Sequence, residues 1–114
     1  MMPRDAISIR QMFDHADEAR QLAVGRVRAD LDTDRLFQLA MTRLLEIVGE
    51  AAGRVSVSTR DQHPQIAWSE IVALRNRLIH GYDAVDCDVM WQIVQLDVPV
   101  LAAELRAIVM QLPN

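Results

Sequence analysis

Apolar residues recur at intervals of three and four along most of this sequence, and this spacing restricts its possible folds more than any other feature. It places apolar side chains along one side of a helix, which predicts amphipathic helices around a shared core. Glycine and proline occur only four times each, which argues against a turn-rich β protein. For 114 residues we expect one domain, residues 1–114, folded as an all-α, antiparallel bundle of four to five helices.

The periodic segments predict five helices, separated by polar residues or proline. They cover approximately residues 8–28, 34–54, 64–80 and 86–96, and a segment that begins near residue 97 and is set apart by Pro99. Asp32 or Thr33 is expected to cap the second helix, and Asp97 the fifth, because such side chains accept bonds from free amide groups. The second helix has the widest apolar stripe and is expected to be central. Gly81 favours a left-handed cap, so the third helix should end at residue 80.

Charge and residue content exclude several classes of function. The net charge is −4 and the sequence pI is about 5.2, so any contact with nucleic acid must depend on a local basic patch. All twelve basic residues are arginine, which excludes lysine-dependent Schiff bases and P-loop phosphate sites. The single Cys87 allows neither an intramolecular disulfide nor a cysteine-based zinc cluster. No apolar run has membrane-spanning length and no signal peptide is visible, so a cytoplasmic protein is expected.

Two acidic segments suggest metal ligands but fit structural roles better. The segment "DLDTD" resembles the start of a calcium loop, yet Arg35 stands where that loop needs glycine. The segment "DHADE" lies on the predicted solvent side of the first helix. Cys87 is flanked by two aspartates, which disfavour a thiolate nucleophile. We therefore expect no metal and no cofactor.

The segment "IVALRNRLIHGYD" concentrates polar chemistry at the end of the third predicted helix. Asn76 and His80 are four residues apart, so the amide could orient the imidazole for proton transfer. Arg75 could hold a phosphate, but helical geometry separates it from His80 by about 140° around the axis. A second copy across a two-fold axis could complete such a site. Alternatively, Arg75 and Arg77 are simply solvated and His80 caps the helix end.

Residues Arg75, His80 and Tyr82 match a pattern of Arg, four residues, His, any residue, Tyr that marks HEPN-domain ribonucleases. The flanking segments "LLEIVGEAAGRVS", "HPQIAWSEIVALRNRLIHGYDAVD" and "VMWQIVQLDVPVLAAELRAI" resemble the HepT-like family in particular. This resemblance runs from about Leu36 onward. It implies a HEPN-like helical bundle that forms a homodimer in which two copies of the motif face one cleft.

The resemblance also implies a function and roles for individual residues. HepT-like proteins are toxins of toxin–antitoxin pairs that cut RNA without a metal, and an MntA-like nucleotidyltransferase antitoxin silences them by attaching AMP to the motif tyrosine. Arg75 and His80 would then be catalytic, Asn76 would support them, and Tyr82 would accept AMP. Arg77 and Arg60 are candidate contacts to RNA phosphates. Cleavage without a metal would leave a 2′,3′-cyclic phosphate.

Two other classes of function remain open at this point. The bundle could be a non-catalytic, nucleotide-binding or regulatory partner of a nucleotidyltransferase, because HEPN bundles resemble the substrate-binding helices of such enzymes. It could also be a structural dimerisation bundle, in which replacing His80 would change only stability. The acidic balance of the chain weakens the expected affinity for RNA.

Overall fold

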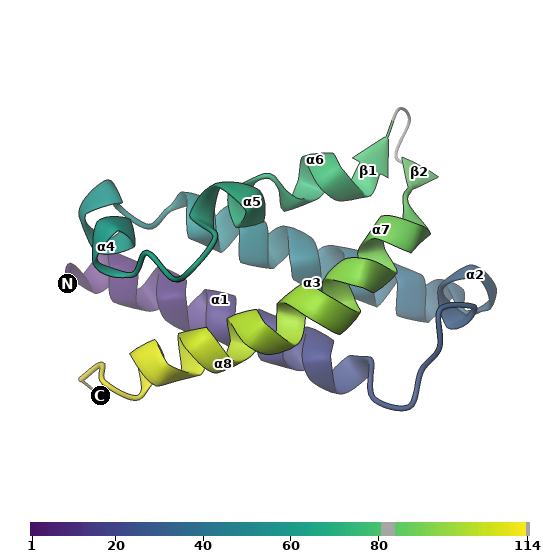
Figure 1. The fold of residues 1–114 in the computed structure, drawn as a ribbon, viewed down its shortest axis with the longest axis horizontal. Helices are drawn as coiled ribbons and strands as arrows, with labels where there is room; N and C mark the ends of the chain where they lie inside the picture. The colour runs from purple at the N-terminus through teal and green to yellow at the C-terminus, as the bar shows by residue number, and fades with distance from the viewer. Residues whose placement is uncertain (81–83, 114) are drawn as a thin grey trace.

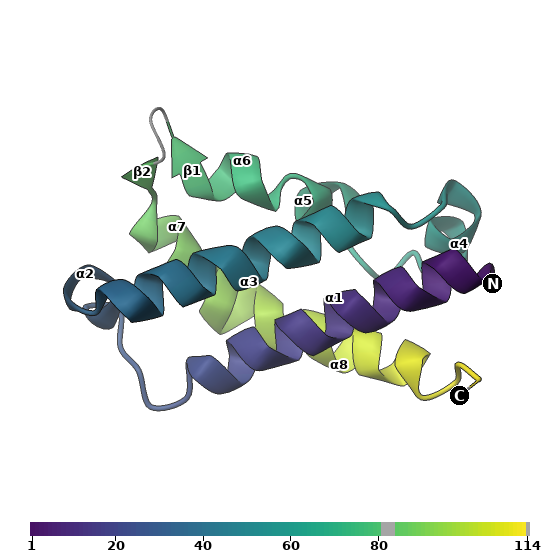
Figure 2. The ribbon, with the colours of Figure 1, turned by 180° about the vertical axis from the view of Figure 1, so that it is seen from behind.

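The chain forms an all-α bundle of four antiparallel rods, as the helical spacing predicts (Figures 1 and 2). The structure is a computed structural model, and it describes residues 1–80 and 84–113. The four rods are α1 (Pro3–Leu22), α3 (Arg35–Gly53), the pair α5 (Trp68–Val72) and α6 (Leu74–Leu78), and the continuous series α7 (Cys87–Gln92), η1 (Ile93–Asp97) and α8 (Val98–Val109). No helix in the described ranges is long and apolar enough to span a membrane.

Helix α1 begins and ends earlier than predicted. It begins at Pro3 and ends at Leu22, whereas the apolar spacing predicted residues 8–28. The chain leaves the helix at Ala23, and Gly25 then takes a φ of 76°, a left-handed conformation that favours glycine. The start of α1 is held by Asp5, a buried carboxylate that accepts hydrogen bonds from Ser56 and Thr59.

Helix α3 confirms the prediction of a central helix at residues 34–54. It packs against α1, α5 and α6, and both of the long rods α1 and α3 contribute fully buried side chains to the core. The predicted caps, Asp32 and Thr33, are wrong, because these residues lie inside the short helix α2 (Asp30–Thr33). Asp34 caps α3 instead, and its Oδ1 accepts from the Phe37 amide at 3.1 Å.

The third predicted helix, residues 64–80, differs most from the structure. Its start is preceded by an additional helix, α4 (Val57–Gln62), and helical structure resumes only at Trp68. It is interrupted at Ala73 and ends at Leu78. Strand β1 (Ile79–His80) then pairs antiparallel with β2 (Ala84–Val85), and the Asp86 amide donates to the Leu78 carbonyl at 2.7 Å. These hydrogen bonds and the strand pairing replace the helical conformation after Leu78.

The last rod is continuous, so the predicted break at Pro99 and the predicted Asp97 cap are both wrong. Proline lacks an amide hydrogen, and its ring would collide with the carbonyl four residues before it in a regular α-helix. The π-helical turn η1 precedes it, with the Val98 amide donating to the Ile93 carbonyl. This wider turn lets the rod pass the proline without ending.

Candidate functional site

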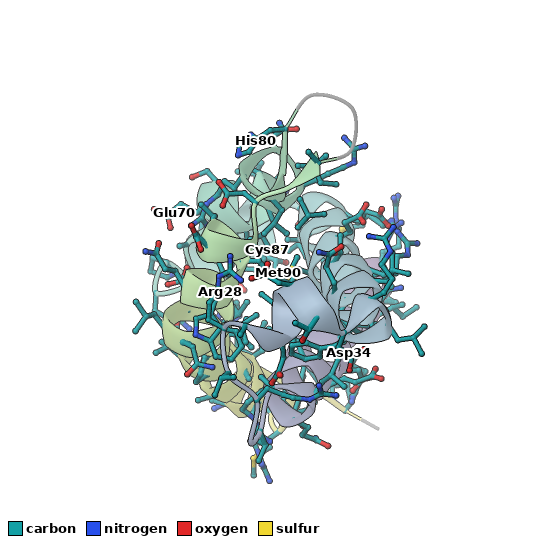
Figure 3. All side chains as sticks on the ribbon, turned by 90° about the vertical axis from the view of Figure 1, so that its right-hand side faces the viewer. Arg28, Asp34, Glu70, His80, Cys87 and Met90 are labelled. Atoms are coloured by element: carbon teal, nitrogen blue, oxygen red, sulfur yellow. The ribbon has the colours of Figure 1, made fainter. Side chains whose placement is uncertain are left out.

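The motif residues that the structure describes lie at one end of the bundle, where α6, the β1–β2 hairpin and the start of α7 meet (Figure 1). Arg75, Asn76 and Arg77 belong to α6, and His80 belongs to β1. Figure 3 shows His80 near the top of the view, and Cys87 and Met90 of α7 nearer its middle. Tyr82, the predicted acceptor of AMP, lies outside the described residues.

His80 is not in a helix, which corrects the expected geometry. Because α6 ends at Leu78, the i to i+4 relation with Asn76 and the 140° separation from Arg75 do not apply. The imidazole is 61% exposed, and its Nε2 lies 3.2 Å from Oδ2 of Asp86. Asp86 therefore occupies the position beside the ring that we had expected for Asn76.

Asp86 links the hairpin to α7 and was not among the site residues predicted from the sequence. Its Oδ1 caps α7 by accepting from the Val89 amide at 3.1 Å, while Oδ2 faces His80. The pKa of this carboxyl is lowered, chiefly by the Val89 hydrogen bond and further by the neighbouring His80. An aspartate six residues after the histidine, at a predicted helix start, was the available signal. Only the hairpin register brings the two together.

Arg75 points toward α3. Its side chain is 60% exposed, and its Nε lies 3.8 Å from Oε2 of Glu46. Arg75 and Asn76 line a shallow hollow of about 310 Å³ together with Glu46, Gly49 and Glu50 of α3. The guanidinium is thus accessible to a ligand but lies in an acidic neighbourhood.

Arg77 faces the opposite side of α6. Its Nη2 lies 3.8 Å from Oδ2 of Asp97, in a groove of about 210 Å³ between α5–α6 and the last rod. Leu96 and Val100 line this groove and are exposed. Glu104 also lines it, and one of its carboxylate oxygens is buried without a hydrogen-bond partner among the described residues. This groove could not be predicted from the sequence, because residues from several helices form it.

Arg60 is not brought to the other candidates. It lies in α4, at the opposite end of the bundle from β1 (Figure 1). Its guanidinium donates to the carbonyls of Val55 (2.9 Å) and Ala52 (3.0 Å) and lies over the Trp68 ring. Arg60 thus satisfies backbone carbonyl groups at and just after the C-terminal end of α3.

The site therefore offers an exposed imidazole with a carboxylate partner and an exposed guanidinium nearby at the same end of the molecule. An imidazole can accept or donate a proton near neutral pH, and a guanidinium can bind phosphate. Within residues 1–80 and 84–113, no group of three or more His, Cys, Asp or Glu side chains is arranged to hold a metal ion.

Residues 12–108 match the family described as "Ribonuclease HepT-like". The chain is 40% identical over 72 residues to "Probable ribonuclease HepT" of Thermococcus cleftensis, covering 63% of this chain and 66% of that one. It is 37% identical over 75 residues to "Putative RNase MJ1380" of Methanocaldococcus jannaschii, covering 66% and 69%. It is 28% identical over 103 residues to "Putative RNase TTE0752" of Caldanaerobacter subterraneus subsp. tengcongensis, covering 87% and 92%. No solved structure matches the chain significantly.

Proposed function

Because the chain belongs to the ribonuclease HepT-like family, we propose that it is a metal-independent endoribonuclease and the toxin of a toxin–antitoxin pair. The ribonuclease names of its relatives support RNA as the substrate. The observation that carries the proposal is the exposed His80 held by a carboxylate, at the same end of the bundle as the exposed Arg75. The protein acts in the cytoplasm.

In the proposed reaction the ribose 2′-oxygen attacks the adjacent phosphorus after giving up its proton. The bond between phosphorus and the 5′-oxygen then breaks, and the leaving oxygen takes a proton. The products are a 2′,3′-cyclic phosphate and a 5′-hydroxyl. His80 exchanges protons in this reaction, and Arg75 stabilises the charge that develops on the phosphate.

The proposed active unit is a homodimer with a composite site. One chain directs Arg75 to Glu46 and His80 to Asp86, and Arg77 to Asp97 on the other side of α6. The motif of a single chain contains one imidazole, that of His80, whereas the reaction needs both a proton acceptor and a proton donor. Two motif copies facing one cleft supply both groups, with Asn76 supporting the arginine and Arg77 available for a further RNA phosphate.

The proposed inhibitor is an MntA-like nucleotidyltransferase antitoxin that attaches AMP to Tyr82. The modified residue is two positions from His80 in the sequence. A bulky anionic nucleotide there would obstruct the imidazole and neutralise the nearby arginines.

RNA cleavage by the purified chain in EDTA tests the enzymatic proposal. The wild-type protein should cut RNA and leave cyclic phosphate ends, and Arg75→Ala and His80→Ala should each lower the rate by about 10²-fold or more. Matched controls are Arg20→Ala, an exposed arginine on α1, and His63→Ala at the opposite end of the bundle. Equal activity in all five proteins, or none in the wild type, would overturn the proposal.

The alternative is a non-catalytic, nucleotide-binding or regulatory partner of a nucleotidyltransferase. It is favoured by the acidic neighbours of the motif, Glu46 and Asp86, which oppose the approach of an RNA backbone. Mass spectrometry after co-expression with a nucleotidyltransferase separates the two functions. AMP on Tyr82 in a protein whose unmodified form cuts no RNA would establish the alternative.

A further inference from the structure

We propose that Asp86 is a positioning residue that holds His80 through Nε2 and thereby makes Nδ1 the atom that exchanges a proton with the substrate. This inference rests on the proposed ribonuclease function for its catalytic consequence. The hydrogen bond itself can be tested without any activity.

The position of Asp86 is determined at three points. Its amide donates to the Leu78 carbonyl at 2.7 Å, its Oδ1 accepts from the Val89 amide at 3.1 Å, and its Oδ2 lies 3.2 Å from Nε2 of His80. Rotating the carboxylate away from the imidazole would disturb the cap of α7. The side chain of Asp86 is only 30% exposed, whereas that of His80 is 61% exposed. A mostly buried acceptor thus contacts an imidazole ring that is mostly exposed.

The partner's chemistry determines which nitrogen carries the proton. An ionised carboxylate can only accept hydrogen bonds, so the ring nitrogen facing it must be Nε2–H. The lowered pKa of Asp86 keeps this carboxyl ionised at neutral pH. In the neutral ring Nδ1 then has the free lone pair, and it can take the proton of the 2′-hydroxyl or, once protonated, give one to the leaving oxygen.

The other charged groups beside the hairpin that belong to the described residues have partners of their own. Arg75 and Arg77 of α6 lie beside Glu46 and Asp97, and β2 carries no charged side chain. Asp88, in the first turn of α7, is bound by Arg28 at 2.8 Å. Asp86 is therefore the charged group in direct contact with His80 within the described part of the chain.

Asp86→Asn is a sharp test because asparagine has one acceptor oxygen and one donor amide. The Val89 amide requires the oxygen, so the NH₂ group turns toward Nε2 of His80. That nitrogen must then accept, which shifts the neutral ring to the Nδ1–H tautomer and removes the lone pair from the substrate side. The helix cap is retained, since asparagine caps as well as aspartate.

The primary measurement is ¹⁵N NMR of the ring nitrogens of His80 in the full chain, with His15 and His63 as internal references. We expect Nε2–H in the wild type and a shift toward Nδ1–H in Asp86→Asn. Asp86→Ser keeps a cap but cannot reach the ring, so it should lose the fixed tautomer. Asp34→Asn is the matched control, because Asp34 caps α3 in the same way without contacting a histidine. An unchanged His80 spectrum in both Asp86 variants would overturn the proposal.

The kinetic measurement tests the catalytic consequence. In Asp86→Asn, kcat for RNA cleavage should fall by about 10²-fold with little change in KM, while Asp34→Asn keeps the wild-type rate. A purely structural role predicts instead that activity follows the fraction of folded protein, which circular dichroism reports. If the NMR shift occurs but the wild type cuts no RNA, the positioning contact stands and the ribonuclease function fails. If the tautomer shifts and kcat does not, the assignment of Nδ1 is refuted.

Discussion

The strongest stability prediction concerns Asp5, the buried carboxylate that ties the start of α1 to α4. Only 2% of this residue is exposed, and its oxygens accept from the Ser56 amide (3.0 Å), the Ser56 hydroxyl (2.6 Å) and the Thr59 hydroxyl (2.6 Å). A hydrogen bond to a charged group contributes roughly 1.5–3 kcal/mol. The contributions do not add fully, since the two hydroxyls also lie 3.3 Å from each other.

We therefore expect Asp5→Asn to lower the free energy of unfolding by about 2–3 kcal/mol at neutral pH, measured by urea denaturation. Asp14→Asn is the control, because Asp14 is exposed on the same helix and should change stability by less than about 0.5 kcal/mol. A loss below 0.5 kcal/mol for Asp5→Asn would show that water satisfies these donors equally well.

The same contacts predict a pH dependence with a defined sign. The two hydroxyl hydrogen bonds from Ser56 and Thr59 lower the pKa of Asp5 in the folded state below the ordinary value of an aspartate. The stabilisation is then present above the unfolded pKa and is lost as the pH falls through the folded one. The difference between wild type and Asp5→Asn should be constant from pH 7 to 5 and shrink below about pH 4. A difference that stays the same at pH 3 would refute the hydrogen-bonding explanation.

Four further substitutions test the packing and the role of Arg60. Gly49→Ala should lower the free energy of unfolding by about 1–3 kcal/mol, because the new Cβ would lie 2.9 Å from the Ile71 carbonyl oxygen. Gly53→Ala is the control: its Cβ would meet no atom within 4 Å, so it should be neutral or slightly stabilising in the same urea denaturation assay. Arg60→Ala should lower the free energy of unfolding by about 1–2 kcal/mol, because the hydrogen bonds to two backbone carbonyls are lost. The RNA cleavage rate per folded molecule should not change. A selective loss of RNA binding would instead support a contact between Arg60 and an RNA phosphate. Trp68→Phe removes the indole hydrogen bond to the His63 carbonyl (3.0 Å) and should lower the thermal midpoint by an amount equivalent to about 1 kcal/mol; an unchanged midpoint would show that this bond contributes nothing net.

The long helices could be predicted from the sequence because their signals are local. The apolar stripe of residues 34–54 lies entirely within one helix, and its width correctly indicated several packed neighbours for α3. The helix ends were less predictable. Gly25 takes a left-handed conformation just after α1, and Asp34 caps the start of α3. Several neighbouring residues could have filled the same roles, so the sequence did not single these two out.

In the candidate site, too, the residue types could be predicted from the sequence but their arrangement could not. The pattern of Arg75, His80 and Tyr82 could be recognised by spacing alone, and the matched family agrees with that recognition. The structure around His80 could not be predicted, because the segment has a strong helical pattern up to its last residues. The hydrogen bond between the Asp86 amide and the Leu78 carbonyl, together with the pairing of β1 and β2, outweighs that local helical preference. His80 therefore lies in a strand.

By itself, the sequence determined the helical class, the central helix and the identity of the polar groups, since each follows from residue type and short-range spacing. Tertiary structure decided which of those groups meet. It paired His80 with Asp86 instead of Asn76, directed Arg75 and Arg77 to opposite sides of α6, and carried the last rod past Pro99 through a π turn. These outcomes depend on hydrogen bonds and packing between segments that are separated along the chain, and no local pattern encodes them.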